Sequence, residues 1–153
     1  MIRPVLTALL LLAACAPASA QVRGDIAILP GSAASELLEQ CSRTTPKPGE
    51  GTWAPSWSDI AALEAALPAA LTERTEARAL ADRTPPEGWV RQYVGLIRDG
   101  RRFVYGNFVP QGSGPDPAPD QILMVCDGGP AFFGVEFEVE AGRITHLAFN
   151  GEA

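Results

Sequence analysis

His146 is the single histidine of this 153-residue chain, so any histidine-based hydrolytic triad would have to use it as the base. The chain has no Gly-x-Ser-x-Gly motif, which would place a serine nucleophile on a sharp turn. Glu136 and Glu138 could in principle serve as the carboxylate pair of a glycosidase, but neighbours on one strand face are expected to be solvated glutamates. A small envelope hydrolase that uses Glu136, His146 and Asp127 therefore stays the alternative interpretation.

Metal chemistry would need ligands at defined spacings. Cys41, Cys126, Asp127 and His146 are nominal ligands, but no close-spaced pair among them resembles a zinc motif. The Asp-Gly-Gly sequence that starts at Asp127 lacks the strand and helix of a phosphate-binding loop and predicts a turn. We expect no metal site and no cofactor.

Three arginines gather around a predicted turn: Arg98, Arg101 and Arg102. A guanidinium binds carboxylates and phosphates through two parallel hydrogen bonds, so this cluster could bind an anionic group of a partner. Trp89 and Phe108 lie near segment ends or on the less covered face of the predicted sheet. Exposed aromatic rings beside arginines are typical of contacts with a protein or a peptide. These five residues form the binding surface that the sequence predicts.

The composition limits the classes of protein. Hydrophobic residues make up 46% of the chain, charged residues 20%, and the net charge is −6. These values indicate one folded domain and argue against a disordered chain or a polytopic membrane protein. The acidic balance argues against nucleic acid as a partner.

Residues 1–20 have the features of a secretory signal peptide. Arg3 precedes a ten-residue apolar run, which is too short to span a bilayer. Ala18-Ser19-Ala20 is an A-x-A cleavage site, whereas residues 12–15 resemble the lipobox of bacterial lipoproteins, with Cys15 as the lipidated residue. We therefore expect a periplasmic or outer-membrane lipoprotein of a Gram-negative bacterium, or a secreted protein. The membrane would be reached only through the lipid anchor at Cys15.

Removal or lipidation of Cys15 leaves Cys41 and Cys126 as an even pair in an oxidising compartment, which predicts a disulfide. It would close a loop of about 85 residues and contribute roughly 4 to 5 kcal/mol through chain entropy. Residues 21–31 would form an arm or tether, or a short edge strand, and residues 32–153 a single α+β domain.

The hydrophobic periodicity predicts two helices followed by strands. The helices cover residues 32–42 and from Ser56 to about Ala81, the second with a capping signature at its start and a kink at Pro68. Strands are predicted over 89–98, 101–109, 122–126 and 133–139, with a last strand after the loop 140–142. The expected fold is α+β, with two N-terminal helices packed on one face of a roughly five-stranded antiparallel meander sheet.

Two turns predict the pairing of the strands. Counting outward from Asp99-Gly100 places Leu96 opposite Phe103 and Tyr93 opposite Gly106. A three-residue loop at 140–142 places His146 opposite Glu136.

Several short segments carry a resemblance. They are Trp53-Ala54-Pro55, Arg91-Gln92-Tyr93, Val125-Cys126-Asp127-Gly128-Gly129, Phe133-Gly134-Val135-Glu136-Phe137 and Phe149-Asn150-Gly151-Glu152-Ala153. The chain resembles small exported proteins of Gram-negative bacteria that have no assigned activity. The resemblance implies export and brings no catalytic residues. The leading hypothesis is a non-catalytic binding or accessory module of the envelope, inhibitor-like in one form, with a protein or peptide partner.

Overall fold

The computed structural model describes residues 18–80, 83–113 and 118–152. Most of the predicted signal peptide, including Cys15, lies outside these residues. The strands are β1 (Gln21–Arg23), β2 (Ile26–Ile28), β3 (Gly51–Trp53), β4 (Trp89–Arg98), β5 (Arg101–Pro110), β6 (Phe133–Glu138) and β7 (Arg143–Phe149). The helices are η1 (Gly31–Ala33), α1 (Ala34–Leu38), α2 (Trp57–Thr72) and η2 (Glu76–Leu80), of which η1 and η2 are 3-10 helices.

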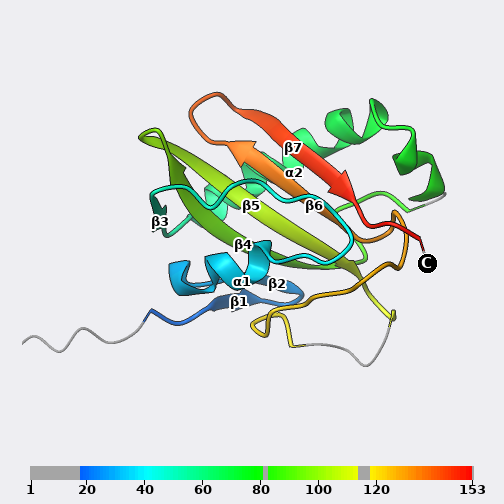
Figure 1. Cartoon of the computed structure of the whole chain (residues 1–153), viewed down its shortest axis with the longest axis horizontal. Coiled ribbons are helices and arrows are strands. Elements are labelled where there is room, and N and C mark those ends of the chain that lie inside the picture. The colour runs from blue at the N-terminus through cyan, green and yellow to red at the C-terminus, as the bar shows by residue number, and fades with distance from the viewer. Residues whose placement is uncertain (1–17, 81–82, 114–117, 153) are drawn as a thin grey trace, which may run out of the picture.

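The described strands form one seven-stranded sheet in the order β1-β2-β4-β5-β6-β7, with β3 paired to β4 off this path (Figure 1). One edge of β4 is shared: β2 runs parallel to its first half, and β3 runs antiparallel to its second half. The other neighbouring pairs are antiparallel. The prediction of a five-stranded antiparallel meander is therefore wrong, because the sheet is larger and contains a parallel pair.

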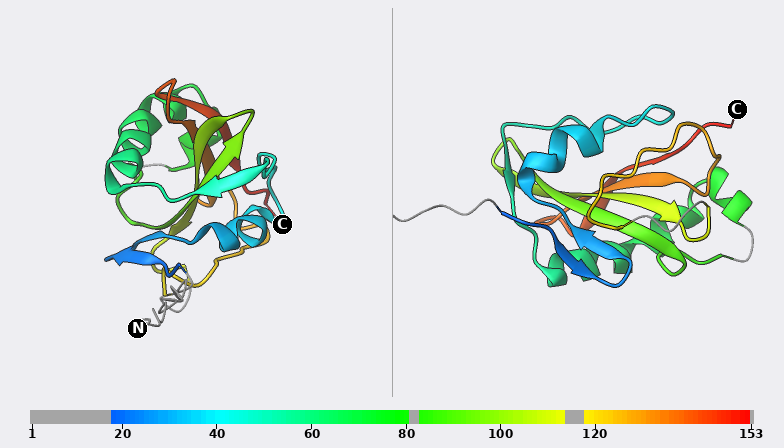
Figure 2. Two further views of the ribbon diagram at one scale, coloured as in Figure 1. Left: turned by 90° about the vertical axis from the view of Figure 1, so that its left-hand side faces the viewer. Right: turned by 90° about the horizontal axis from the view of Figure 1, so that it is seen from below.

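The two α-helices lie on opposite faces of the sheet, not on one face as predicted (Figure 2). The long strands are apolar on both sides, which requires cover on both sides. Tyr93 and Phe108 face the core under α2, whereas Val94, Leu96 and Tyr105 face a second core under α1. The predicted arrangement left the other face of the sheet uncovered, which is the source of the error.

Helix α1 is much shorter than predicted. It ends at Leu38, because the backbone of Glu39 leaves the helical region and side chains take over the last carbonyls. Thr45 Oγ1 donates to the Leu38 oxygen at 2.8 Å, and Gln40 Nε2 donates to the Leu37 oxygen at 3.0 Å. Cys41 lies beyond the end of the helix and is exposed.

Helix α2 starts as predicted. Ser56 caps it, with Asp59 completing a reciprocal capping box, and Pro68 lies inside the helix without ending it. The helix ends at Thr72, about nine residues earlier than expected, and a separate 3-10 turn, η2, follows. No helix among the described residues is long and apolar enough to cross a membrane.

Both predicted hairpin registers are confirmed. Leu96 pairs with Phe103 and Tyr93 with Gly106 across β4 and β5. In the second hairpin His146 pairs with Glu136, and a bulge follows between Glu136 and Phe137.

Residues 122–126 do not form the predicted central strand. They run without regular structure over the α1 face of the sheet, and Met124 is 46% exposed. An apolar run of five residues can equally cover a sheet, which is what this segment does.

Candidate functional site

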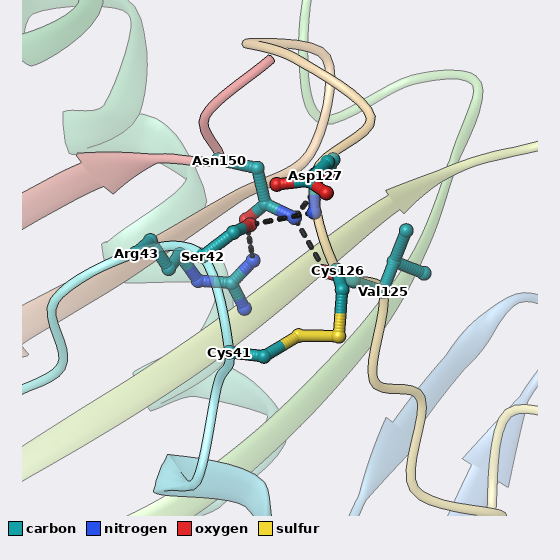
Figure 3. Close-up of a disulfide and its surroundings, with 7 residues drawn as sticks. All are labelled: Cys41, Ser42, Arg43, Val125, Cys126, Asp127 and Asn150. Carbon is teal, nitrogen blue, oxygen red and sulfur yellow. Dashed lines mark hydrogen bonds between the residues drawn. A yellow bond between two sulfur atoms is a disulfide. The ribbon is translucent and has the colours of Figure 1, made fainter. Parts of the chain in front are cut away.

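The predicted disulfide joins Cys41 to Cys126, with 5.2 Å between the two Cα atoms (Figure 3). It connects the segment after α1 to the segment before β6, and both cysteines are exposed. Next to it, the Asp127 amide donates to Ser42 Oγ at 2.9 Å. The disulfide thus fastens together two irregular segments that cover the α1 face of the sheet.

Arg43 is a buried cation beside this disulfide (Figure 3). Its guanidinium donates to Asn150 Oδ1 at 2.6 Å and to Asn107 Oδ1 at 2.5 Å, with a longer contact of 3.5 Å to the Tyr105 hydroxyl. Burial raises the pKa of Tyr105, while the Arg43 charge acts in the opposite direction, and Tyr105 stays a neutral phenol at neutral pH. Gly134 leaves room for the side chains of Arg43 and Tyr105, since a Cβ on residue 134 would overlap the Tyr105 hydroxyl oxygen.

The three arginines of the predicted binding surface are each paired with a glutamate. Arg98 donates to Glu136, Arg101 to Glu138 and Arg102 to Glu140, at distances of 2.7, 2.7 and 2.6 Å. Arg143 also contacts Glu138, and Glu50 accepts the amides of Asp99 and Gly100. The hairpin tip therefore carries balanced charge and no excess of positive charge.

The expectation that Glu136 and Glu138 are solvated is wrong, because their side chains are only 3% and 5% exposed. Arginines from β4, β5 and β7 cover them, with Thr145 Oγ1 donating to Glu136 at 2.7 Å.

The two aromatic residues of the predicted surface lie in the core under α2. Trp89 and Phe108 are both fully buried. Trp89 Nε1 donates to the Ala131 oxygen at 2.7 Å, and Phe108 stacks on Phe133 with ring centroids 4.5 Å apart. The structure therefore does not bring these rings to Arg98, Arg101 or Arg102, and Arg83 instead lies over the ring of Trp89, 5.8 Å from its centroid.

The residues of the hydrolase alternative also have other partners. His146 Nε2 is 2.9 Å from the Thr44 oxygen, Glu136 is held by Arg98, and Asp127 lies in the turn beside the disulfide. Neither carboxylate is bonded to His146 in the described residues. Within the same residues, no three His, Cys, Asp or Glu side chains are grouped to hold a metal ion.

A groove lies elsewhere, between the end of α2 and the segment that follows it. This groove is an open cavity of about 330 Å³, at the small end of the range for ligand sites. Its lining residues are Pro68, Leu71, Thr72, Arg74, Ala77, Arg78, Leu80, Arg83, Thr84 and Pro85. All the charged residues in the described lining of the groove are arginines. An apolar floor with cationic and hydroxyl groups at the rim can bind an anion attached to an apolar body.

Arg74 is held at the rim by several contacts. It donates to the Leu147 oxygen on β7 at 2.8 Å and to Glu76 at 2.9 Å, and it lies over the ring of Phe149. The hydrogen bond from Arg74 lowers the pKa of the exposed Glu76 to about 2. These contacts hold the Arg74 side chain in place, and Glu76 neutralises part of its charge.

Arg78 and Arg83 extend the groove in two directions. Neither has an ion pair within the described ranges 18–80, 83–113 and 118–152. Arg78 also lines a hollow that reaches Phe149 and Glu152, and Arg83 lines another that reaches Glu87 and Gln111. The adjoining hollows give the groove an elongated shape.

The sequence prediction of a helix to about Ala81 includes Arg74 and Arg78 as exposed charged residues of that helix and gives no indication of the groove. In the helix predicted to reach about Ala81, a spacing of four residues would place these two arginines on one side, although in the structure they lie outside α2. Arg83, whose amide donates to the Leu80 oxygen at 3.0 Å, lines the same cavity, and no pattern in the sequence indicates this.

No family model, no curated protein and no solved structure matches this chain.

Proposed function

We propose that the protein is a non-catalytic binding or accessory module of the bacterial envelope whose groove binds a carboxylate on an apolar segment of a protein or peptide partner. The observation that carries the proposal is the groove at Arg74, Arg78 and Arg83, in a chain whose net charge is −6. An arginine fork can bind a carboxylate in two hydrogen bonds, and Thr84 adds a hydroxyl donor at the same rim.

The floor of the groove supports an apolar segment beside the carboxylate. Leu71 and Leu80 are 8% and 6% exposed, and Pro68 and Pro85 complete the lining. The hollows that continue past Arg78 and Arg83 favour an extended peptide over a compact small molecule. Inhibitor-like capture of a secreted enzyme is one form that this binding would take.

Export is part of the same proposal. The disulfide requires an oxidising compartment to form and persist, which supports a periplasmic or secreted location. The choice between lipidation at Cys15 and cleavage after Ala20 is tested by labelling cells with a fatty-acid analogue. A parent protein that stays unlabelled, as a Cys15→Ser variant should, would contradict the lipoprotein route.

Binding is tested with acetyl-leucyl-leucine as a free acid and as its C-terminal amide, followed by amide NMR shifts of the disulfide-intact protein. We expect the free acid to shift the amides around Arg78 and Thr84, with a weaker effect for the amide. The Arg78→Glu variant should lose this response, because it reverses one charge at the rim.

Lys47→Glu is the matched control, since it makes the same charge change at an exposed residue outside the groove. Equal binding of acid and amide, or equal losses in the two variants, would contradict a carboxylate site at the groove. A crosslinking pull-down in cells that recovers the same proteins with wild type and Arg78→Glu would count against a partner at this site.

A further inference from the structure

Residues 119–127, here called the strap, are held on the α1 face of the sheet by side-chain amides. Gln92 Nε2 donates to the Pro119 and Gln121 oxygens at 2.9 and 2.6 Å, and Gln92 Oε1 accepts the Leu123 amide at 3.0 Å. Asn107 Nδ2 donates to the Leu123 oxygen at 2.9 Å. Each bonded strap residue is two positions from the next, which is the period of an extended chain.

The same pattern continues at the disulfide end of the strap (Figure 3). Asn150 Nδ2 donates to the Val125 and Asp127 oxygens at 2.7 and 2.8 Å. The residues bound through their backbone are thus 119, 121, 123, 125 and 127. Three amide side chains, Gln92, Asn107 and Asn150, supply all of these contacts; we call them the amide row.

The amide row is a rigid feature of the fold. Gln92 and Asn107 are opposite each other on β4 and β5, and Asn107 Nδ2 also donates to Gln92 Oε1 at 3.1 Å. Arg43 fixes the oxygens of Asn107 and Asn150. All three amides are at most 5% exposed with the strap in place, and these bonds keep them oriented toward the strap backbone.

The amide row contacts the backbone of the strap, not its polar side chains. Met124 in the middle of the strap is 46% exposed. Recognition of an extended backbone at alternate residues is a common way to bind peptides, because it tolerates many side chains.

The disulfide at Cys126 is the cross-link that ties the strap to the segment after α1. Because Cys41 and Cys126 are both exposed, a dithiol can reach the disulfide. The dithiol gives up two electrons and two protons, which convert the disulfide into two thiols, and is itself oxidised to a disulfide. Reduction leaves the strap held by its hydrogen bonds and by its packing at Ile122.

We propose that the amide row is a binding site for the backbone of an extended peptide, filled by the strap in the oxidised protein and made available to a partner peptide when the Cys41–Cys126 disulfide is reduced. This site lies on the opposite face of the sheet from α2 and is independent of the groove.

Hydrogen exchange tests the release of the strap. The Leu123 amide should exchange about tenfold faster or more after reduction with dithiothreitol, since the cross-link no longer restricts local opening. The amides of the β4–β5 ladder should keep their protection, which shows that the sheet stays folded. Equal protection of Leu123 with and without the disulfide would overturn the proposal.

Binding in trans is tested with a synthetic peptide of residues 118–128 that carries serine in place of Cys126. The receptor is the full chain with Cys41→Ser, Cys126→Ser and Leu123→Pro, because proline removes the amide that Gln92 accepts and weakens the tethered strap. We expect this receptor to bind the peptide, and the disulfide-intact wild type not to bind it.

Two controls make the result specific to the amide row. A control receptor that carries Met124→Ala in place of Leu123→Pro keeps the contacts between the strap and the amide row. It should bind the peptide more weakly than the proline receptor does. A peptide N-methylated at its residue 123 should bind the proline receptor about fivefold more weakly, as expected for the loss of one hydrogen bond. Equal binding of the methylated and unmethylated peptides, or no binding by a receptor whose β4–β5 amides remain protected, would overturn the proposal.

Discussion

Replacement of Arg43 by methionine tests the role of the buried cation beside the disulfide. The change removes the hydrogen bonds to Asn107 and Asn150 and leaves two buried amide oxygens without that donor. Each orphaned acceptor costs about 1–3 kcal/mol. Loss of the buried guanidinium, whose Nε has no partner among the described residues, offsets part of this cost. We expect a net decrease of about 2–4 kcal/mol in the free energy of unfolding.

Urea unfolding followed by far-ultraviolet circular dichroism, with the disulfide intact, measures this change. The exposed Arg78→Met is the matched control and should stay within about 0.5 kcal/mol of wild type. Arg43→Lys should also destabilise, because a lysine cannot reproduce the planar fork that reaches both amides. Equal stability of Arg43→Met and Arg78→Met would refute the assignment of Arg43 as the group that holds the covering segment to the sheet.

Three further outcomes follow from the contacts described above. Gly134→Ala should lower the free energy of unfolding by about 1–3 kcal/mol, because the new Cβ would meet the buried side chains of Tyr105 and Arg43. Gly51→Ala is the control and should lower it less in the same urea assay, because the nearest atom to its Cβ is 3.8 Å away. Ser56→Ala should cost about 1 kcal/mol through loss of the capping box, measured as a lower urea midpoint with unchanged slope. The carboxyl of Glu76 should titrate near pH 2 by NMR and return toward 4.5 in Arg74→Gln. A depressed pKa means that this ion pair is present above the ordinary pKa and is lost as the pH falls toward 2, so an unchanged titration in the variant would contradict the pairing.

The parts of the fold that were predictable are those with local signals. The β4–β5 hairpin depends on Asp99 and Gly100, which adopt positive φ angles of 50° and 68° and fix the register of ten residue pairs. The capping box at Ser56 is local in the same way. The disulfide followed from the number of cysteines and their expected compartment.

The parts that were missed depend on partners far away in the sequence. The parallel pair joins Ile26 to Arg91, and no local pattern announces such a pairing. The strap is apolar like a strand, but its backbone partners are the side chains of Gln92, Asn107 and Asn150. Alternation alone does not show whether a polar strand residue faces water or another segment of the chain.

The candidate site shows the same division. The sequence identified arginine as the residue type for binding but selected the hairpin tip, because the cluster there is close in sequence. The glutamates that neutralise it come from β6 and from the loop after β6. The groove at Arg74, Arg78 and Arg83 becomes visible only in the folded structure, where Arg83 lies near the end of α2.

The parallel pairing of β2 with β4 sets a delay on folding during synthesis. A chain is made from its N-terminus at about 5–20 residues per second, and the partner of Ile26 is Arg91, 65 residues further along. Strand β2 therefore waits about 3 to 13 seconds for its neighbour to be made. During that time the segment that follows the predicted export signal has no sheet to join, which is the unfolded condition in which a polypeptide can be threaded through a membrane.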